Sequence, residues 1–94
     1  FWEILPGQGD YYNPDFITMD NDTIQKKGYL TNIITDMSID WLETQRDKNK
    51  PFCLFIHHKA AHRNWLPERK YLSEYEDQTF TTITITAQPP PQPK

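Results

Sequence analysis

The segment Lys50–Trp65 reads KPFCLFIHHKAAHRNW, and this part of the chain decides the expected fold. Its run Phe52–Ile56 is apolar at every position, so a strand formed there needs cover on both faces. The pattern predicts a strand over Phe52–His57 in a parallel sheet sandwiched between helices, which is the α/β class. In such sheets ligands bind just beyond the carboxyl ends of the strands. Donors and cations that suit an anion follow the run at that end: His57, His58, Lys59, His62 and Arg63.

A helix is predicted before this strand, from about Thr31 to Arg46. Apolar side chains recur at helical spacing along one stripe, formed by Leu30, Ile33, Ile34, Met37 and Trp41. Thr31 is the expected N-cap, and Pro51 lies beyond the helix because proline cannot continue one. Ile39 falls on the opposite side from the stripe.

Shorter elements are expected on either side of this pair. Phe16–Met19 and Thr23–Ile24 read as short strands joined by a turn of Asp20, Asn21 and Asp22. A short helix is expected over Glu68–Tyr75. The β-branched residues of Thr79–Thr86 favour a strand, and Gln88–Lys94 is expected to be extended polyproline II or disordered.

Composition limits the chain to one domain of a water-soluble type. It has 94 residues, is 36% hydrophobic and 24% charged, and carries a net charge of −3. The acidic balance argues against nucleic acid as the main partner. No apolar run approaches the roughly 20 residues of a membrane span. The one cysteine, Cys53, cannot form an internal disulfide, and inside the apolar run it is expected to be buried.

The chain is expected to be incomplete as a folding unit. It starts at Phe1 without an initiator Met, which we interpret as a piece of a longer protein. One helix and one or two strands cannot cover both faces of a sheet, and small chains are already short of buried area. Self-association is therefore expected of the isolated segment.

His62 is the first candidate for chemistry. An imidazole just beyond a strand can donate a hydrogen bond to an anion or protonate a leaving oxygen near neutral pH. Lys59 and Arg63 can pair with an anion's oxygens. The alternatives are a surface histidine and solvated loop cations. No metal site is predicted from the histidines, because their spacing matches no known motif and no cysteine or carboxylate stands beside them.

A glycine-rich loop near the N-terminus is the second candidate site. Its sequence, from Gly7 to Pro14, is GQGDYYNP and mixes amides, a carboxylate and aromatic rings. Carbohydrate sites use this mixture, because rings stack on sugar faces while amides bond to hydroxyls. Tyr11, Tyr12 and Asn13 are therefore candidate substrate contacts. The alternative is an ordinary surface loop with packed tyrosines.

Three stretches in order resemble bacterial members of the formylglycine sulfatase family that act on glycan sulfate esters of the N-acetylglucosamine type. They are Trp2–Gly9 with Tyr11–Pro14, Gly28–Thr31 leading into the Ile34–Leu42 helix, and Lys50–Arg63. The resemblance covers about residues 1–77, which would be a fragment of the catalytic domain. Residues 78–94 form a divergent Thr- and then Pro-rich tail.

The resemblance implies a partial alkaline-phosphatase-like sheet-and-helix layer and hydrolysis of sulfate esters on carbohydrates. His62 aligns with the family's sulfate-contacting histidine, and Lys59 with a sulfate-facing lysine of some subfamilies. The family's calcium ligands and its Cys/Ser-x-Pro/Ala-x-Arg motif, the source of formylglycine, are absent from these residues. The fragment alone is therefore expected to be inactive. A periplasmic or extracellular location is implied by the resemblance only.

Ala61 stands where many relatives have proline, so the loop before His62 is expected to be less rigid. Two further readings stay open. One is a small non-catalytic module that binds a glycan through the tyrosine loop, or a polyproline-recognising domain through the tail. The other is a structural fragment that self-associates.

Overall fold

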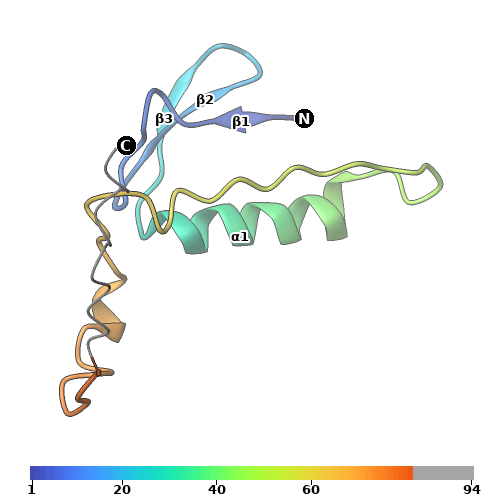
Figure 1. Ribbon diagram of the computed structural model, residues 1–94. Helices are drawn as coiled ribbons and strands as arrows, with labels where there is room; N and C mark the ends of the chain where they lie inside the picture. Colours follow the sequence, from blue (N-terminus) through green and yellow to red (C-terminus); the bar gives the residue numbers. More distant parts are fainter. Residues whose placement is uncertain (82–94) are drawn as a thin grey trace, which may run out of the picture.

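The computed structural model describes residues 1–81, and its N-terminal part forms a small antiparallel sheet (Figure 1). The strands β1 (Glu3–Ile4), β2 (Asp15–Thr18) and β3 (Thr23–Gln25) lie in the order β1-β2-β3. The register pairs Ile4 with Ile17, and Phe16 with Ile24. The predicted combination of sheet and helix, the α/β class, is confirmed. This sheet is antiparallel, however, and is built from residues before the helix.

The hairpin of β2 and β3 agrees with its prediction. The turn closes with Asn21 donating its backbone N–H to the Thr18 carbonyl at 2.9 Å, and Thr18 donating to the Asp22 carbonyl at 2.9 Å. Asn21 has φ 68°, a left-handed conformation that asparagine adopts more readily than most residues. Local turn chemistry therefore sets these two strands.

The predicted helix is confirmed with nearly the expected bounds. Helix α1 runs from Leu30 to Asp40, and a π-helical turn, η1 (Trp41–Gln45), extends it until Arg46 becomes extended. The predicted N-cap is wrong: Tyr29 caps the helix without a side-chain hydrogen bond. The reason is that the Leu30 N–H, which would lack a partner at a helix start, donates to the Tyr11 carbonyl at 2.8 Å.

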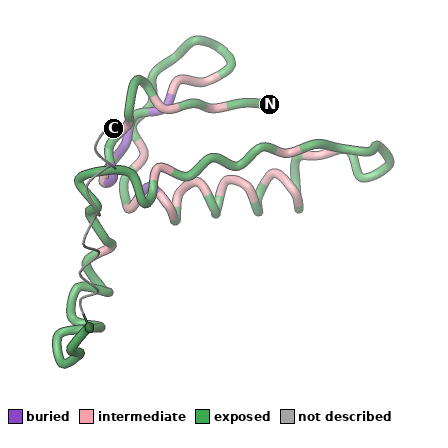
Figure 2. The backbone as a smooth tube through the Cα atoms, in the orientation of Figure 1, coloured by how far each residue is buried: buried purple, intermediate pink, exposed green. Residues whose placement is uncertain are grey.

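The buried core is small and lies where the sheet meets the start of α1 (Figure 2). Its hydrophobic members among the described residues are Tyr11, Phe16 and Leu30, which are 5%, 2% and 1% exposed. Lys26 links the sheet to the helix through an ion pair and a contact with a sulfur atom. Its ammonium pairs with the Glu3 carboxylate at 2.6 Å and lies 3.2 Å from the Met37 sulfur.

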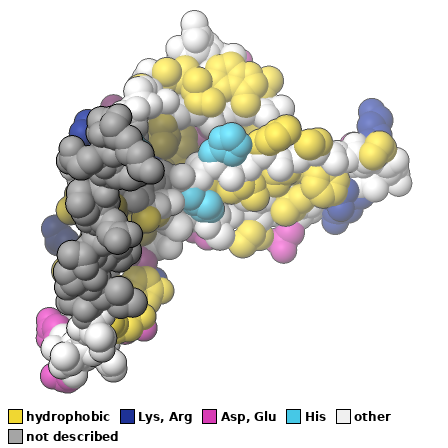
Figure 3. All heavy atoms as spheres, viewed as in Figure 1, with side chains coloured by type: hydrophobic (Ala, Val, Ile, Leu, Met, Phe, Trp, Pro, Cys, Tyr) yellow, Lys and Arg dark blue, Asp and Glu magenta, His cyan; other side chains and the backbone are white. Residues whose placement is uncertain are grey.

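The prediction of a strand over Phe52–His57 is wrong for this chain. The segment is extended and returns beside α1, where the rings of Phe52 and Trp41 lie 5.6 Å apart, but it pairs with no strand among residues 1–81 (Figure 1). Phe55 is 79% exposed, and Cys53 is also exposed rather than buried. An apolar strand needs partners on both edges and cover on both faces, and the described residues supply neither. Hydrophobic side chains therefore lie open on this surface (Figure 3).

The short helix predicted over Glu68–Tyr75 forms only as a 3₁₀ turn, η2 (Arg69–Tyr71), followed by further turns. Its apolar side chains, Tyr71, Leu72 and Tyr75, are 52–60% exposed. An amphipathic helix of this length gains most of its stability from packing. Contacts such as Tyr75 with Phe80 at 5.8 Å and Arg69 over the Tyr12 ring at 5.9 Å leave its apolar side chains more than half exposed. Of the strand predicted over Thr79–Thr86, residues 79–81 are not a strand. Its remainder and Gln88–Lys94 lie outside the described residues.

The dimensions agree with the expectation of an incomplete folding unit. The radius of gyration is 20.2 Å, whereas a compact domain of this length would have about 12 Å. The accessible surface is 8545 Å², against roughly 5,700 Å² for a compact protein of this mass. Among residues 1–81, no helix has the length and hydropathy needed to cross a bilayer.

Candidate functional site

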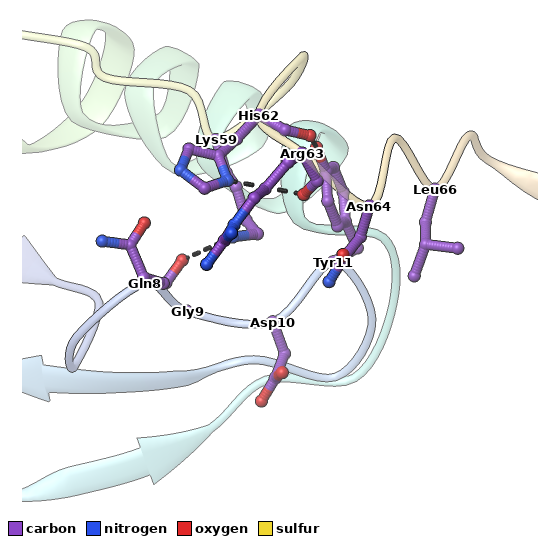
Figure 4. Close-up of a pocket in the computed structure, with 9 residues that line it drawn as sticks. All are labelled: Gln8, Gly9, Asp10, Tyr11, Lys59, His62, Arg63, Asn64 and Leu66. Carbon is purple, nitrogen blue, oxygen red and sulfur yellow. Dashed lines mark hydrogen bonds between the residues drawn. The ribbon is translucent and has the colours of Figure 1, made fainter.

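A cavity of about 190 Å³ opens where the glycine-rich loop meets the loop after the apolar run (Figure 4). The first loop contributes Gln8, Gly9, Asp10 and Tyr11, and the second contributes Lys59, His62, Arg63, Asn64 and Leu66. Four residues singled out from the sequence therefore lie together: Tyr11, Lys59, His62 and Arg63. Small-molecule pockets usually measure about 300–1,000 Å³. The present cavity is smaller, so its lining residues form one part of a binding site, with room for a small anion.

Gly9 shapes the first loop. Its φ is +62°, which disfavours a side chain, and a Cβ placed there would lie 2.8 Å from Cδ1 of Leu5, so Leu5 would have to move. Its N–H donates to the Pro6 carbonyl at 3.0 Å. The turn carries Gln8 to the cavity and leads directly into the buried ring of Tyr11.

Lys59 ties the two loops together from the opposite side. Its ammonium donates to the Gln8 carbonyl at 2.7 Å and lies 5.2 Å from the centre of the Tyr11 ring. Lys59 and Gln8 are 51 positions apart in the sequence, so this is a long-range contact. The cation therefore lies inside the cavity wall, with a carbonyl and an aromatic face as its neighbours.

His62 and Arg63 follow on a tight turn. The His62 N–H donates to the Lys59 carbonyl at 2.8 Å, and its exposed ring has Nδ1 3.4 Å from the Arg63 carbonyl oxygen. Neither Lys59 nor Arg63 forms an ion pair within residues 1–81. The one carboxylate of the cavity, Asp10, points away from them in Figure 4. The described wall thus presents two cations and an imidazole, an arrangement that suits an anion.

Tyr12 and Asn13, predicted as substrate contacts, lie beside the cavity rather than in its lining. The Tyr12 hydroxyl donates to the Pro67 carbonyl at 2.7 Å. The Asn13 side-chain oxygen accepts the Gly28 N–H at 2.9 Å, and its backbone N–H donates to the Gly28 carbonyl at 2.8 Å. Both side chains therefore hold neighbouring backbone in this structure.

His57 and His58 are exposed and do not line the cavity. Gln8, which belongs to the candidate glycine-rich loop, lines the cavity, and its carbonyl accepts the hydrogen bond of Lys59. Leu66 was not singled out from the sequence, because its position depends on how the second loop folds. No spacing in the sequence indicates that the loops meet.

The described residues do not form a metal site. Within residues 1–81, no three His, Cys, Asp or Glu side chains come close enough together to hold an ion. The donors that the resemblance would require for a family cation are therefore not assembled by this part of the chain.

Comparison with known proteins relates this geometry to an enzyme family. No protein-family model matches the chain. It is 52% identical over 82 residues to the N-acetylglucosamine-6-O-sulfatase of Bacteroides thetaiotaomicron, covering 84% of this chain and 14% of that protein. It also matches a solved structure of a protein in complex with its substrate, D-glucosamine-2-N,6-O-disulfate, with a TM-score of 0.78 and 52% identity. That match covers 85% of this chain and 16% of the other. Because sequence and backbone agree over the same large share of its residues, the chain belongs to the sulfatase family as a segment of such a protein.

Proposed function

We propose that this chain is part of a sulfatase that hydrolyses sulfate esters on carbohydrates, glucosamine-type sugars above all. His62 would contact the sulfate near the leaving oxygen, and Lys59 would face the same group. One observation carries the proposal: Lys59, His62 and Arg63 line one cavity with no carboxylate paired to the two cations within residues 1–81. The similar curated protein is named N-acetylglucosamine-6-O-sulfatase, and the similar solved structure holds D-glucosamine-2-N,6-O-disulfate as its substrate.

The chemistry assigned to these residues is binding and proton transfer. Arg63 and Lys59 would neutralise charge on the sulfate oxygens, Arg63 with its fork of donors and Lys59 as a point charge. His62 would donate a proton to the alcohol oxygen as the S–O bond breaks. Arg63 would be a substrate contact. The hydrogen bonds of Tyr11, Tyr12 and Asn13 favour a role in holding the loops instead.

Other parts of the proposal concern what lies outside these residues. Formylglycine would supply the nucleophile and calcium the main cation, as the resemblance implies, and neither would come from this segment. Cys53 is followed by Leu54, Phe55 and Ile56, which is not the maturation motif. Residues 1–77 would belong to the catalytic domain and 78–94 to a divergent tail. A periplasmic or extracellular location remains part of the proposal.

The test is kinetic and uses the complete enzyme that contains this chain, assayed on 6-O-sulfated glucosamine. His62→Ala should lower kcat/KM by roughly 10²–10⁴-fold, the range for a positioned proton donor. Lys59→Ala should act mainly through KM, because it removes a charge from anion binding. His58→Ala is the matched control, since His58 is an exposed neighbour outside the cavity lining. Wild-type kinetics in His62→Ala would remove His62 from the site.

A further inference from the structure

We propose that three tyrosine hydroxyls fix the backbone of the loop His62–Pro67 and thereby set the position of the His62 imidazole. The three residues, Tyr11, Tyr12 and Tyr29, are called the tyrosine clamp below. They would be positioning residues rather than substrate contacts. This inference rests on the proposed function of His62.

The clamp is defined by three hydrogen bonds of one kind. The Tyr11 hydroxyl donates to the His62 carbonyl at 2.6 Å, that of Tyr12 to the Pro67 carbonyl at 2.7 Å, and that of Tyr29 to the Leu66 carbonyl at 2.9 Å. The donors precede their acceptors by 37 to 55 residues. Every bond ends on a backbone oxygen, so the clamp constrains the path of the loop whatever its side chains are.

The tyrosines form a rigid base for these bonds. The rings of Tyr11 and Tyr29 stack at 6.2 Å, and those of Tyr12 and Tyr29 lie 5.2 Å apart. Tyr12 and Tyr29 also pair through a β-bridge, and the Tyr11 carbonyl accepts the first N–H of α1. Tyr11 is 5% exposed. Side chains held this way lose little further freedom when they bind the loop.

The loop itself has little else to hold it. Trp65 has a φ of 39°, a left-handed conformation that is unfavourable for a bulky residue and persists only where its surroundings enforce it, and Asn64 before it has a φ of 80°. The Trp65 side chain is 71% exposed, so it does not pack the loop down. One further tie secures the loop's far end, where Glu68 accepts a hydrogen bond from the Asn32 amide at 2.9 Å. Within residues 1–81, the three hydroxyls supply the long-range hydrogen bonds to the loop's own backbone, while the bond from Lys59 to Gln8 holds the residues just before it.

The experiment is a double-mutant cycle in the complete enzyme. Tyr11→Phe removes one hydroxyl and keeps the stacked ring, and it should lower kcat/KM roughly 10-fold, since even small displacements of a catalytic group slow the reaction strongly. In the His62→Ala background the same substitution should change kcat/KM by less than about two-fold, because the group it positions is gone. Tyr12→Phe, whose hydroxyl is at the surface, provides a second cycle should Tyr11→Phe fold poorly. Tyr75→Phe is the control, because the Tyr75 hydroxyl donates no hydrogen bond within residues 1–81.

The outcomes separate the two proposals. A loss in Tyr11→Phe that disappears in His62→Ala, with Tm nearly unchanged, supports the clamp. An equal loss in both backgrounds means a general structural role and overturns it, as does wild-type kcat/KM in both tyrosine variants. If His62→Ala itself keeps wild-type kcat/KM, the proposed role of His62 fails, and the positioning role falls with it.

Discussion

A substitution at Phe55 tests why the run Phe52–Ile56 pairs with no strand among residues 1–81. Its side chain is 79% exposed in this chain, although the run Phe52–Ile56 has the composition of a strand buried on both faces. We expect Phe55→Ser to have opposite effects in two contexts. In the 94-residue chain it should reduce self-association, and in the complete enzyme it should lower stability.

The magnitude follows from the exposed area. Aromatic side chains bury about 150–250 Å² each, so covering the exposed part of Phe55 removes about 120–200 Å² from water. At about 25 cal/mol per Å², this is worth about 3–5 kcal/mol, an upper estimate for one contact between chains. Losing a buried phenylalanine in the complete enzyme should cost a similar amount, about 3–5 kcal/mol.

Sedimentation velocity over a range of concentrations measures the first effect, and denaturant unfolding of the complete enzyme measures the second. Met19→Ser is the control for the isolated chain, because it removes an exposed apolar side chain from the hairpin turn rather than from the run. A neutral Phe55→Ser in the complete enzyme would refute the reasoning, since the run would then be exposed in both contexts. Phe55→Ser chains that associate as strongly as the unsubstituted chain would refute the first half.

Two further predictions concern the stability of the complete enzyme. Leu30→Ala should cost about 2–5 kcal/mol of unfolding free energy, because Leu30 is 1% exposed at the start of α1; denaturant unfolding measures this, and a loss below about 1 kcal/mol would contradict the packing. Gly9→Ala should lower Tm and also weaken catalysis, because the new Cβ would lie 2.8 Å from Leu5 in a left-handed residue that shapes the cavity. Gly7→Ala has a similar φ, of +55°, but no atom within 4 Å of the new Cβ, so the difference between the two variants measures the contact alone.

Elements set by local sequence were predictable, and those set by distant partners were not. The stripe from Leu30 to Trp41 specifies α1 by its spacing, and the turn around Asn21 specifies the hairpin. The run Phe52–Ile56 specifies a strand only where edges exist to pair with it. The run is exposed in this structure because residues 1–81 supply no neighbouring strand for it to pair with.

The candidate site was also predictable only in part. Lys59, His62 and Arg63 stood out because polar residues follow an apolar run, and the structure brings all three to one cavity. The meeting of that loop with the tyrosine loop was not predictable, because it depends on hydroxyl-to-carbonyl bonds between residues up to 55 positions apart. A tyrosine's ring can be inferred to pack from its surroundings in sequence, but the carbonyl that its hydroxyl meets cannot.

The cavity forms although the run Phe52–Ile56 is not a strand in the described structure, because the two loops that line the cavity are bonded directly to each other. Lys59 bonds to the Gln8 carbonyl, and the tyrosine hydroxyls bond to the loop that follows. None of these bonds passes through Phe52–Ile56, so strand pairing is not needed to bring the loops together. Under the proposed function, the larger sheet that the family resemblance implies would fix where this wall stands relative to the nucleophile and cation that other residues would supply. If the proposed function holds, the segment would contain a sulfate-contacting wall and would still be expected to lack activity, since such groups accelerate a reaction only when the reacting atoms are held against them.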